Sequence, residues 1–86
     1  MDDLTKEQEA FLVDYLRRNF FQIKNINPKY SAYGLKQYFS REHFYITQEQ
    51  FTTAMRIAGF DARDIGNGNA RFNISQKSPY LRNPQI

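Results

Sequence analysis

Hydrophobic residues recur every three or four positions in three separate stretches of the chain. In the first stretch, residues 5–20, the apolar stripe consists of Phe11, Leu12, Tyr15, Leu16 and Phe20. Thr5 and Gln8 have the spacing of a capping box, in which two side chains bond the unsatisfied N–H groups of a first turn. This pattern predicts a helix that begins near Thr5 and ends around residue 20.

The second stretch follows a connector that has no helical period. Pro28 cannot occupy the middle of a helix, and the asparagines around it favour turns; a short strand at residues 21–23 fits the same segment. Ser31 is the expected N-cap of the next helix. Its apolar face contains Leu35, Tyr38 and Phe39, and we expect it to stop between Arg41 and His43.

The third stretch has the clearest helix boundaries. Thr47 and Gln50 form a second capping box, Ile46 and Phe51 stand at the positions of a hydrophobic staple, and Gly59 is a typical C-terminal stop. The face predicted to meet the core consists of Phe51, Ala54, Met55 and Ala58. The opposite, polar arc consists of Glu49, Thr52, Thr53 and Arg56.

After the third helix the period changes to two. Asn67-Gly68 is a strong hairpin signal, because a type I′ turn needs positive φ at both central residues. Apolar and polar residues alternate over residues 70–75, which predicts a half-buried strand whose partner is residues 60–65. Residues 77–86 contain two prolines and no period, so we expect a C-terminal tail that is loose or laid along the surface.

These elements predict one domain over residues 1–76, of the α+β class and mostly helical, with three short helices followed by a β-hairpin wing. At 86 residues and 41% hydrophobic content, the chain is large enough for one core. The absence of cysteine excludes disulfides and thiolate metal sites. No apolar run reaches the length of a membrane span and the first residues are acidic, so we expect a cytoplasmic protein without a membrane partner.

Charge is distributed unevenly along the chain. Residues 1–14 hold five acidic residues and one lysine, a balance of −4, whereas the remaining 72 residues hold eleven basic and four acidic residues, a balance of +7. A basic body on a small domain attracts polyanions, and nucleic acid is the commonest of these. Many basic proteins bind no nucleic acid, so charge alone gives only even odds that this protein binds it.

The order of helix, connector, helix, turn, helix and hairpin resembles a winged helix-turn-helix domain over roughly residues 5–76. The segment "YGLKQYFSREHFYITQEQFTTAMRIAGF" also resembles small proteins carried by phages and mobile elements of Gram-positive bacteria. The chain departs from the tight helix-turn-helix in one respect. About seven residues separate Phe39 from Thr47, where the tight motif has three or four.

The resemblance implies a small regulator that binds double-stranded DNA, with the third helix in the major groove and the hairpin on the backbone. Arg56 would read guanine, and threonine can meet a base edge or a thymine methyl group. Glu49 counts against this geometry unless it accepts from a cytosine amino group. The groove-facing set implied is Glu49, Thr52, Thr53 and Arg56, and the phosphate contacts implied are Lys36, Arg41, Arg63 and Arg71. A single copy covers few base pairs, so useful affinity calls for a homodimer on a two-fold site.

Other interpretations stay open. The polar arc of the third helix is also what an ordinary solvated helix face looks like. The acidic start and Glu49 suit a module that binds a host protein, such as an inhibitor or adaptor of a host enzyme. His43 is the only histidine, and no constellation of residues supports catalysis, a metal or a cofactor, so we expect a protein that is not an enzyme.

Overall fold

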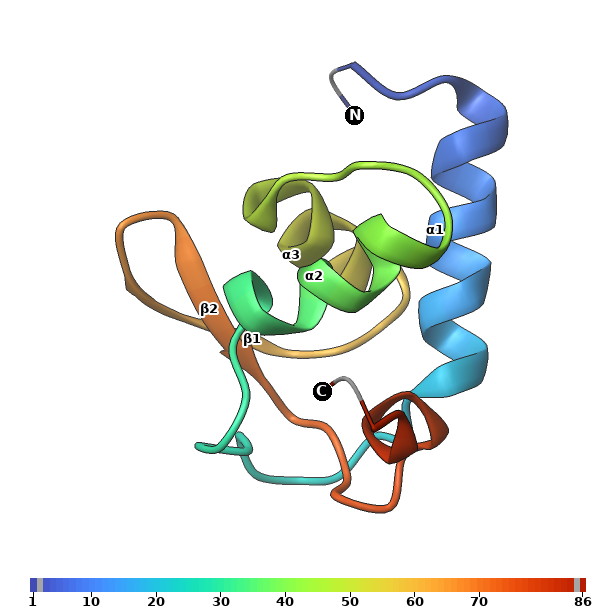
Figure 1. The fold of residues 1–86 in the computed structure, drawn as a ribbon. Coiled ribbons are helices and arrows are strands. Elements are labelled where there is room, and N and C mark those ends of the chain that lie inside the picture. Colours follow the sequence, from blue (N-terminus) through green and yellow to red (C-terminus); the bar gives the residue numbers. More distant parts are fainter. Residues whose placement is uncertain (2, 85) are drawn as a thin grey trace.

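The computed structural model describes residue 1, residues 3–84 and residue 86, and it consists of three helices followed by a hairpin (Figure 1). The predicted α+β, mostly helical fold class is therefore confirmed. The elements are α1 (Lys6–Asn19), α2 (Ala32–Glu42), α3 (Gln48–Ile57), β1 (Ala62–Gly66), β2 (Asn69–Phe72) and a 3₁₀ helix, η1 (Pro79–Arg82). None of the helices in the described part of the chain is long and apolar enough to cross a bilayer.

Local capping sets the ends of α1 and α3 as predicted. Thr5 accepts from the Gln8 backbone N–H at 3.0 Å, and the Gln8 side chain accepts from the Thr5 N–H at 3.0 Å. Thr47 and Gln50 form the same reciprocal pair at the start of α3. Gly59 follows α3 with φ of 103°, a left-handed conformation that glycine adopts without strain.

The hairpin turns at Asn67 and Gly68, which have φ of 55° and 74°, as the type I′ prediction requires. β1 and β2 pair antiparallel. The connector between α1 and α2 lies along the other edge of β2, where the Ile23 N–H donates to the Asn73 carbonyl at 2.9 Å. The short strand predicted at residues 21–23 is a single bridge between Gln22 and Ile74.

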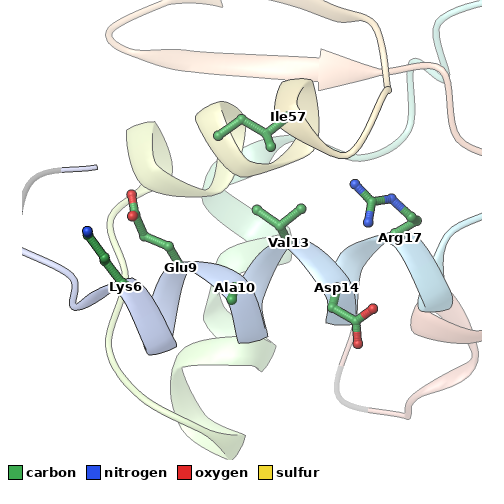
Figure 2. A pocket seen from close by; sticks show the side chains of 7 residues that line it. All are labelled: Lys6, Glu9, Ala10, Val13, Asp14, Arg17 and Ile57. Carbon is green, nitrogen blue, oxygen red and sulfur yellow. The ribbon is translucent and has the colours of Figure 1, made fainter.

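Helix α1 packs against α3 on the side of the molecule opposite the hairpin (Figure 1). A groove remains between the two helices, with an apolar floor and charged rims (Figure 2). It is lined by Lys6, Glu9, Ala10, Val13, Asp14, Arg17 and Ile57.

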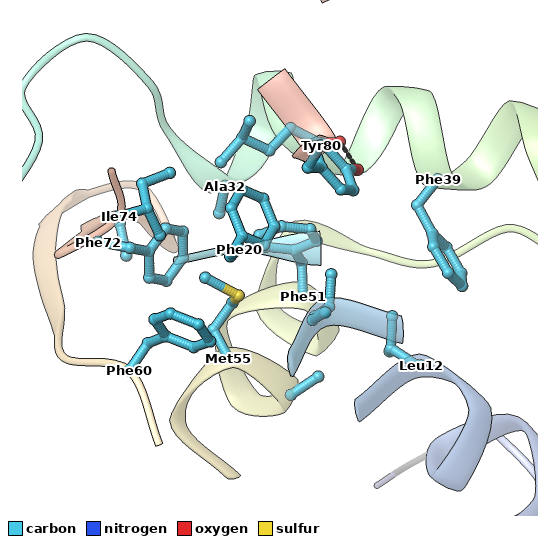
Figure 3. Packing of buried hydrophobic residues seen from close by; sticks show 14 of the residues in the cluster. Leu12, Phe20, Ala32, Phe39, Phe51, Met55, Phe60, Phe72, Ile74 and Tyr80 are labelled. Carbon is cyan, nitrogen blue, oxygen red and sulfur yellow. Dashed lines mark hydrogen bonds between the residues drawn. The ribbon is translucent and has the colours of Figure 1, made fainter. Parts of the chain in front are cut away.

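The core lies where α2, α3 and β2 meet the end of α1 (Figure 3). The rings of Phe20, Phe51 and Phe72 are buried there. The buried Asn73 side chain accepts from the Asp61 N–H at 2.7 Å and donates to the Ile23 carbonyl at 2.9 Å. One amide side chain therefore ties β2 to the segments on both of its edges.

Ser78 and the 3₁₀ helix η1 are part of this core, so the prediction of a loose tail over residues 77–86 was wrong for that stretch, and residue 85 lies outside the described residues. Ser78 and Tyr80 are fully buried. The Tyr80 ring stacks on Phe20 with centroids 4.5 Å apart, and its hydroxyl donates to the Leu35 carbonyl (Figure 3). The Ser78 hydroxyl accepts from the Phe21 N–H at 2.8 Å. These contacts are long-range, and a single turn of 3₁₀ helix leaves no period in the sequence.

Candidate nucleic-acid interface

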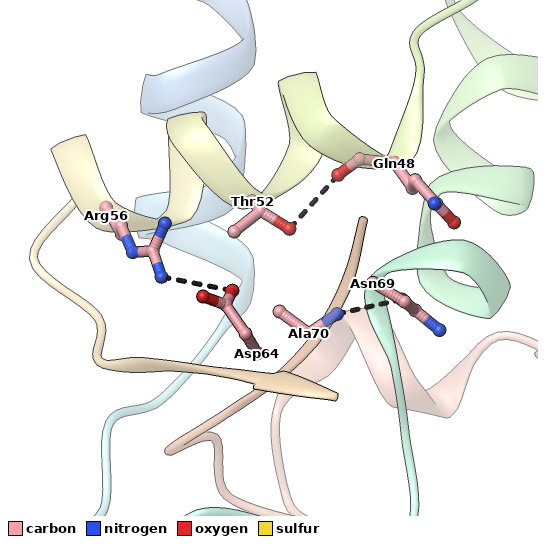
Figure 4. Close-up of polar contacts among 6 residues, drawn as sticks. All are labelled: Gln48, Thr52, Arg56, Asp64, Asn69 and Ala70. Atoms are coloured by element: carbon pink, nitrogen blue, oxygen red, sulfur yellow. Dashed lines mark hydrogen bonds and ion pairs between the residues drawn. The ribbon is translucent and has the colours of Figure 1, made fainter. Parts of the chain in front are cut away.

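Three of the four side chains predicted for the outer arc of α3 are exposed. Glu49, Thr53 and Arg56 face solvent along the helix. Thr52 does not: it is buried, and its hydroxyl donates to the Gln48 carbonyl at 3.1 Å (Figure 4). The expectation that Thr52 faces a groove of DNA is therefore corrected.

Thr52 is buried because the hairpin folds over that side of α3. The Gln48 amide donates to the Asn67 carbonyl in the turn at 2.6 Å. Gly68 lies so close to α3 that a Cβ at this position would collide with the Glu49 carboxylate. What stays open is a shallow groove between α3 and the hairpin, lined by Glu49, Thr52, Thr53, Arg56, Asp64 and Gly68.

The groove carries more acid than base. The Arg56 guanidinium lies 3.5 Å from the Asp64 carboxylate, and the two side chains are 50% and 80% exposed (Figure 4). Glu49 stands one helical turn from Thr53 on the same arc. Asp64 was not among the residues predicted for the site. Its place could have been found from the alternation of the strand, because it pairs with the buried Ala70 and so points toward α3.

The two hairpin arginines lie on the other face of the hairpin. Arg63 and Arg71 are directly opposite each other in the register, one position away from the Asp64 and Ala70 pair. Arg63 is exposed, whereas Arg71 is half-buried and its Nε has no hydrogen-bond partner. Neither forms an ion pair within the described residues. Like charges directly opposite on a sheet face repel, so an anion bound between them would be stabilising.

The two cations predicted on α2 differ in their surroundings. Arg41 is exposed in the last turn of α2. Lys36 is only 8% exposed, with its ammonium 4.6 Å from the centroid of the Tyr45 ring. The predicted site residues therefore occupy three places: the α3 groove, the outer face of the hairpin, and α2.

Three other titratable side chains, His43, Tyr15 and Tyr80, contact aromatic rings; His43 is exposed, Tyr15 is half-buried and Tyr80 is buried. His43 contacts the rings of Phe11 and Tyr15, with centroids 5.1 and 4.8 Å away. Desolvation by burial raises the pKa of Tyr15 to about 12, and burial also raises the pKa of Tyr80. No three His, Cys, Asp or Glu side chains gather in a way that could hold a metal ion in the described part of the chain.

Comparison with known proteins identifies no relative. No protein-family model, curated protein or solved structure matches the chain. The function must therefore be argued from the exposed ridge of α3, the unpaired arginines of the hairpin and the basic charge of the chain beyond α1.

Proposed function

We propose that the protein binds double-stranded DNA as a small winged-helix regulator of a phage or mobile element. The observation that carries the proposal is the position of the hairpin beside the exposed ridge of α3, with two unpaired arginines on its outer face. An isolated bridge between Gln22 and Ile74, just beyond β2, holds the connector beside the hairpin. This order of elements is the one in which a winged-helix domain inserts a helix into the major groove.

The α3 ridge offers base contacts from Thr53 and Arg56. Arg56 must leave Asp64 to reach a base, and an exposed ion pair of this kind is worth at most about 1 kcal/mol. A bidentate contact from arginine to guanine is worth about 1–3 kcal/mol in discrimination, so the exchange is favourable at the correct base. Glu49, at the start of the helix, would accept from a cytosine amino group and would repel a phosphate.

Arg63 and Arg71 supply the contact with the DNA backbone. They bring two positive charges to one spot where the described part of the chain provides no compensating carboxylate. A phosphate bound there relieves their repulsion. Each phosphate neutralised in this way makes the affinity fall more steeply with salt.

Fluorescence anisotropy with a labelled random-sequence duplex at two salt concentrations tests the proposal. We expect weak binding that falls steeply as salt rises. With a selected site, Arg56→Ala should reduce sequence preference, whereas Arg71→Ala should weaken binding to all sequences alike. Arg18→Ala on α1 is the matched control, because it removes the same charge on the side of the molecule away from the hairpin. No binding of wild-type protein at low salt would contradict the proposal.

A second function, binding of a host protein, is supported by the groove between α1 and α3. Ile57 is exposed beside Val13, and the rims carry both signs of charge (Figure 2). In this case Ile57→Asp would abolish capture of the partner without unfolding the domain, because the side chain is already in water. Arg71→Ala would leave capture unchanged. Unaltered capture by Ile57→Asp would contradict a role for this groove.

A further inference from the structure

A separate surface is formed by Tyr33 and Lys36 of α2 together with Tyr45 of the turn before α3. We call these three residues the tyrosine–lysine patch. The Lys36 ammonium lies 4.6 Å from the Tyr45 ring centroid and 5.9 Å from the Tyr33 ring centroid. Because both rings contact one ammonium, residues from two elements share a single site.

The charge of Lys36 is left without an anion. The side chain is more than nine-tenths buried, yet it makes no hydrogen bond or ion pair to any residue that the structure describes. The Lys36 nitrogen is not among the enclosed polar atoms that lack a partner, so the buried part is the aliphatic stem and the ammonium reaches the surface. There it lies against two aromatic rings and can meet an anion. The surroundings of Lys36 therefore favour an anionic ligand.

The two tyrosine rings are open to solvent. Tyr33 is 56% exposed and Tyr45 is 68% exposed, the highest value among the large hydrophobic side chains that are exposed. Unlike Tyr15, Tyr38 and Tyr80, neither ring belongs to a packed aromatic pair. The ring faces turned away from the Lys36 ammonium are therefore available to a flat, apolar ligand.

Asn69 adds a polar group beside this patch. Its side-chain oxygen accepts from the Tyr33 N–H at 2.9 Å and from the Ala70 N–H at 3.0 Å. These bonds fix the side chain at the start of α2, as Figure 4 shows in part. The amide nitrogen has no partner among the described residues, so it remains a donor at the start of α2, the helix that carries Tyr33.

We propose that the tyrosine–lysine patch binds an unpaired nucleotide of single-stranded nucleic acid. The base stacks on the exposed tyrosine faces, the phosphate meets the Lys36 ammonium, and the Asn69 amide donates to the edge of the base. A nucleotide is the ligand that combines a flat face, an acceptor edge and a negative charge within this span. A base paired within a duplex does not present its face, so this site is distinct from duplex binding at α3 and stands without it.

The test measures anisotropy of a labelled oligothymidylate of about 15 nucleotides, a length within the range that stacking sites cover. Tyr45→Ala and Tyr33→Ala should each weaken binding about tenfold, whereas Tyr45→Phe should bind as the wild type does because stacking is kept. Lys36→Met should also weaken binding. Lys29→Met is the matched control, since Lys29 is exposed and lies 5.5 Å from the centroid of the Tyr30 ring.

An abasic oligomer of the same length separates stacking from simple attraction to phosphate. We expect it to bind at least tenfold more weakly than oligothymidylate. Equal affinity for the two oligomers, or an unchanged affinity of Tyr45→Ala for oligothymidylate, would overturn the proposal. Duplex binding that survives in Tyr45→Ala while oligothymidylate binding is lost would support it and leave the α3 proposal intact.

Discussion

Replacement of Asp64 by asparagine should strengthen binding to DNA, because it removes an acid from the groove that we propose to face the duplex. Asp64 holds Arg56 at 3.5 Å. In the variant, the guanidinium keeps a polar neighbour but loses the charge that competes with DNA. The same change removes the repulsion between the Asp64 carboxylate and the nearest phosphate.

The size of the effect follows from the exposure of the pair. Both side chains are at least half exposed, so a high dielectric constant applies. A phosphate that contacts Arg56 would lie roughly 7 Å from Asp64, where the repulsion in water is about 0.6 kcal/mol. One such phosphate corresponds to a roughly threefold gain in affinity, and several nearby phosphates to about tenfold. The free energy of unfolding should change by less than about 1 kcal/mol, because exposed ion pairs contribute little.

The assay is duplex anisotropy for the wild type, Asp64→Asn and a control of equal charge. Glu7→Gln on α1 is a suitable control, since Glu7 is exposed and α1 lies across the molecule from the hairpin. We expect the Asp64→Asn gain to exceed the Glu7→Gln gain severalfold at low salt. Equal gains from the two variants would show that only net charge matters, and they would refute the reasoning that places the groove on the DNA.

Three further predictions concern the fold that holds the site. Tyr80→Ala should lower the free energy of unfolding in urea by about 3–5 kcal/mol, because it removes a fully buried ring; an effect below about 1 kcal/mol would contradict the packing of the tail. Gly68→Ala should cost about 1–2 kcal/mol on the same measurement, since φ is 74° there, and an unchanged midpoint would contradict the type I′ turn. Stability should fall above pH 10: the pKa of Tyr15 is raised to about 12, so its contribution is complete below the unfolded pKa and is lost as pH rises through the folded one. Tyrosinate absorbance followed against pH checks this, and ionisation of every tyrosine near pH 10 would contradict it.

Local chemistry explains why most of the fold could be predicted from the sequence. The capping boxes of α1 and α3 and the Asn67-Gly68 turn each act over a few residues, so their signals are complete within a short window. The sequence signal for the bridge at Gln22 was weaker than these, because its partner Ile74 lies far along the chain. Burial of Tyr80 depends on contacts with α1 and α2, and no local pattern records them.

The site was harder to predict than the fold because its polar residues are placed by tertiary contacts. Thr52 occupies an outward position by helical period, and only the folded-back hairpin buries it. The sequence predicts Lys36 as a surface cation, and only the fold shows that its ammonium lies against the rings of Tyr33 and Tyr45. The pairing of Arg56 with Asp64 crosses from α3 to the hairpin, so neither residue alone indicates it.

The most direct test of the central proposal is the salt dependence of duplex affinity for the wild type and for the double variant Arg63→Ala/Arg71→Ala. We expect the logarithm of the wild-type affinity to fall steeply with the logarithm of salt. The double variant should bind more weakly, with a slope shallower by about 2, because Arg63 and Arg71 each neutralise one phosphate. A wild-type protein that does not bind duplex at low salt, or a double variant with the wild-type slope, would contradict the proposed interface.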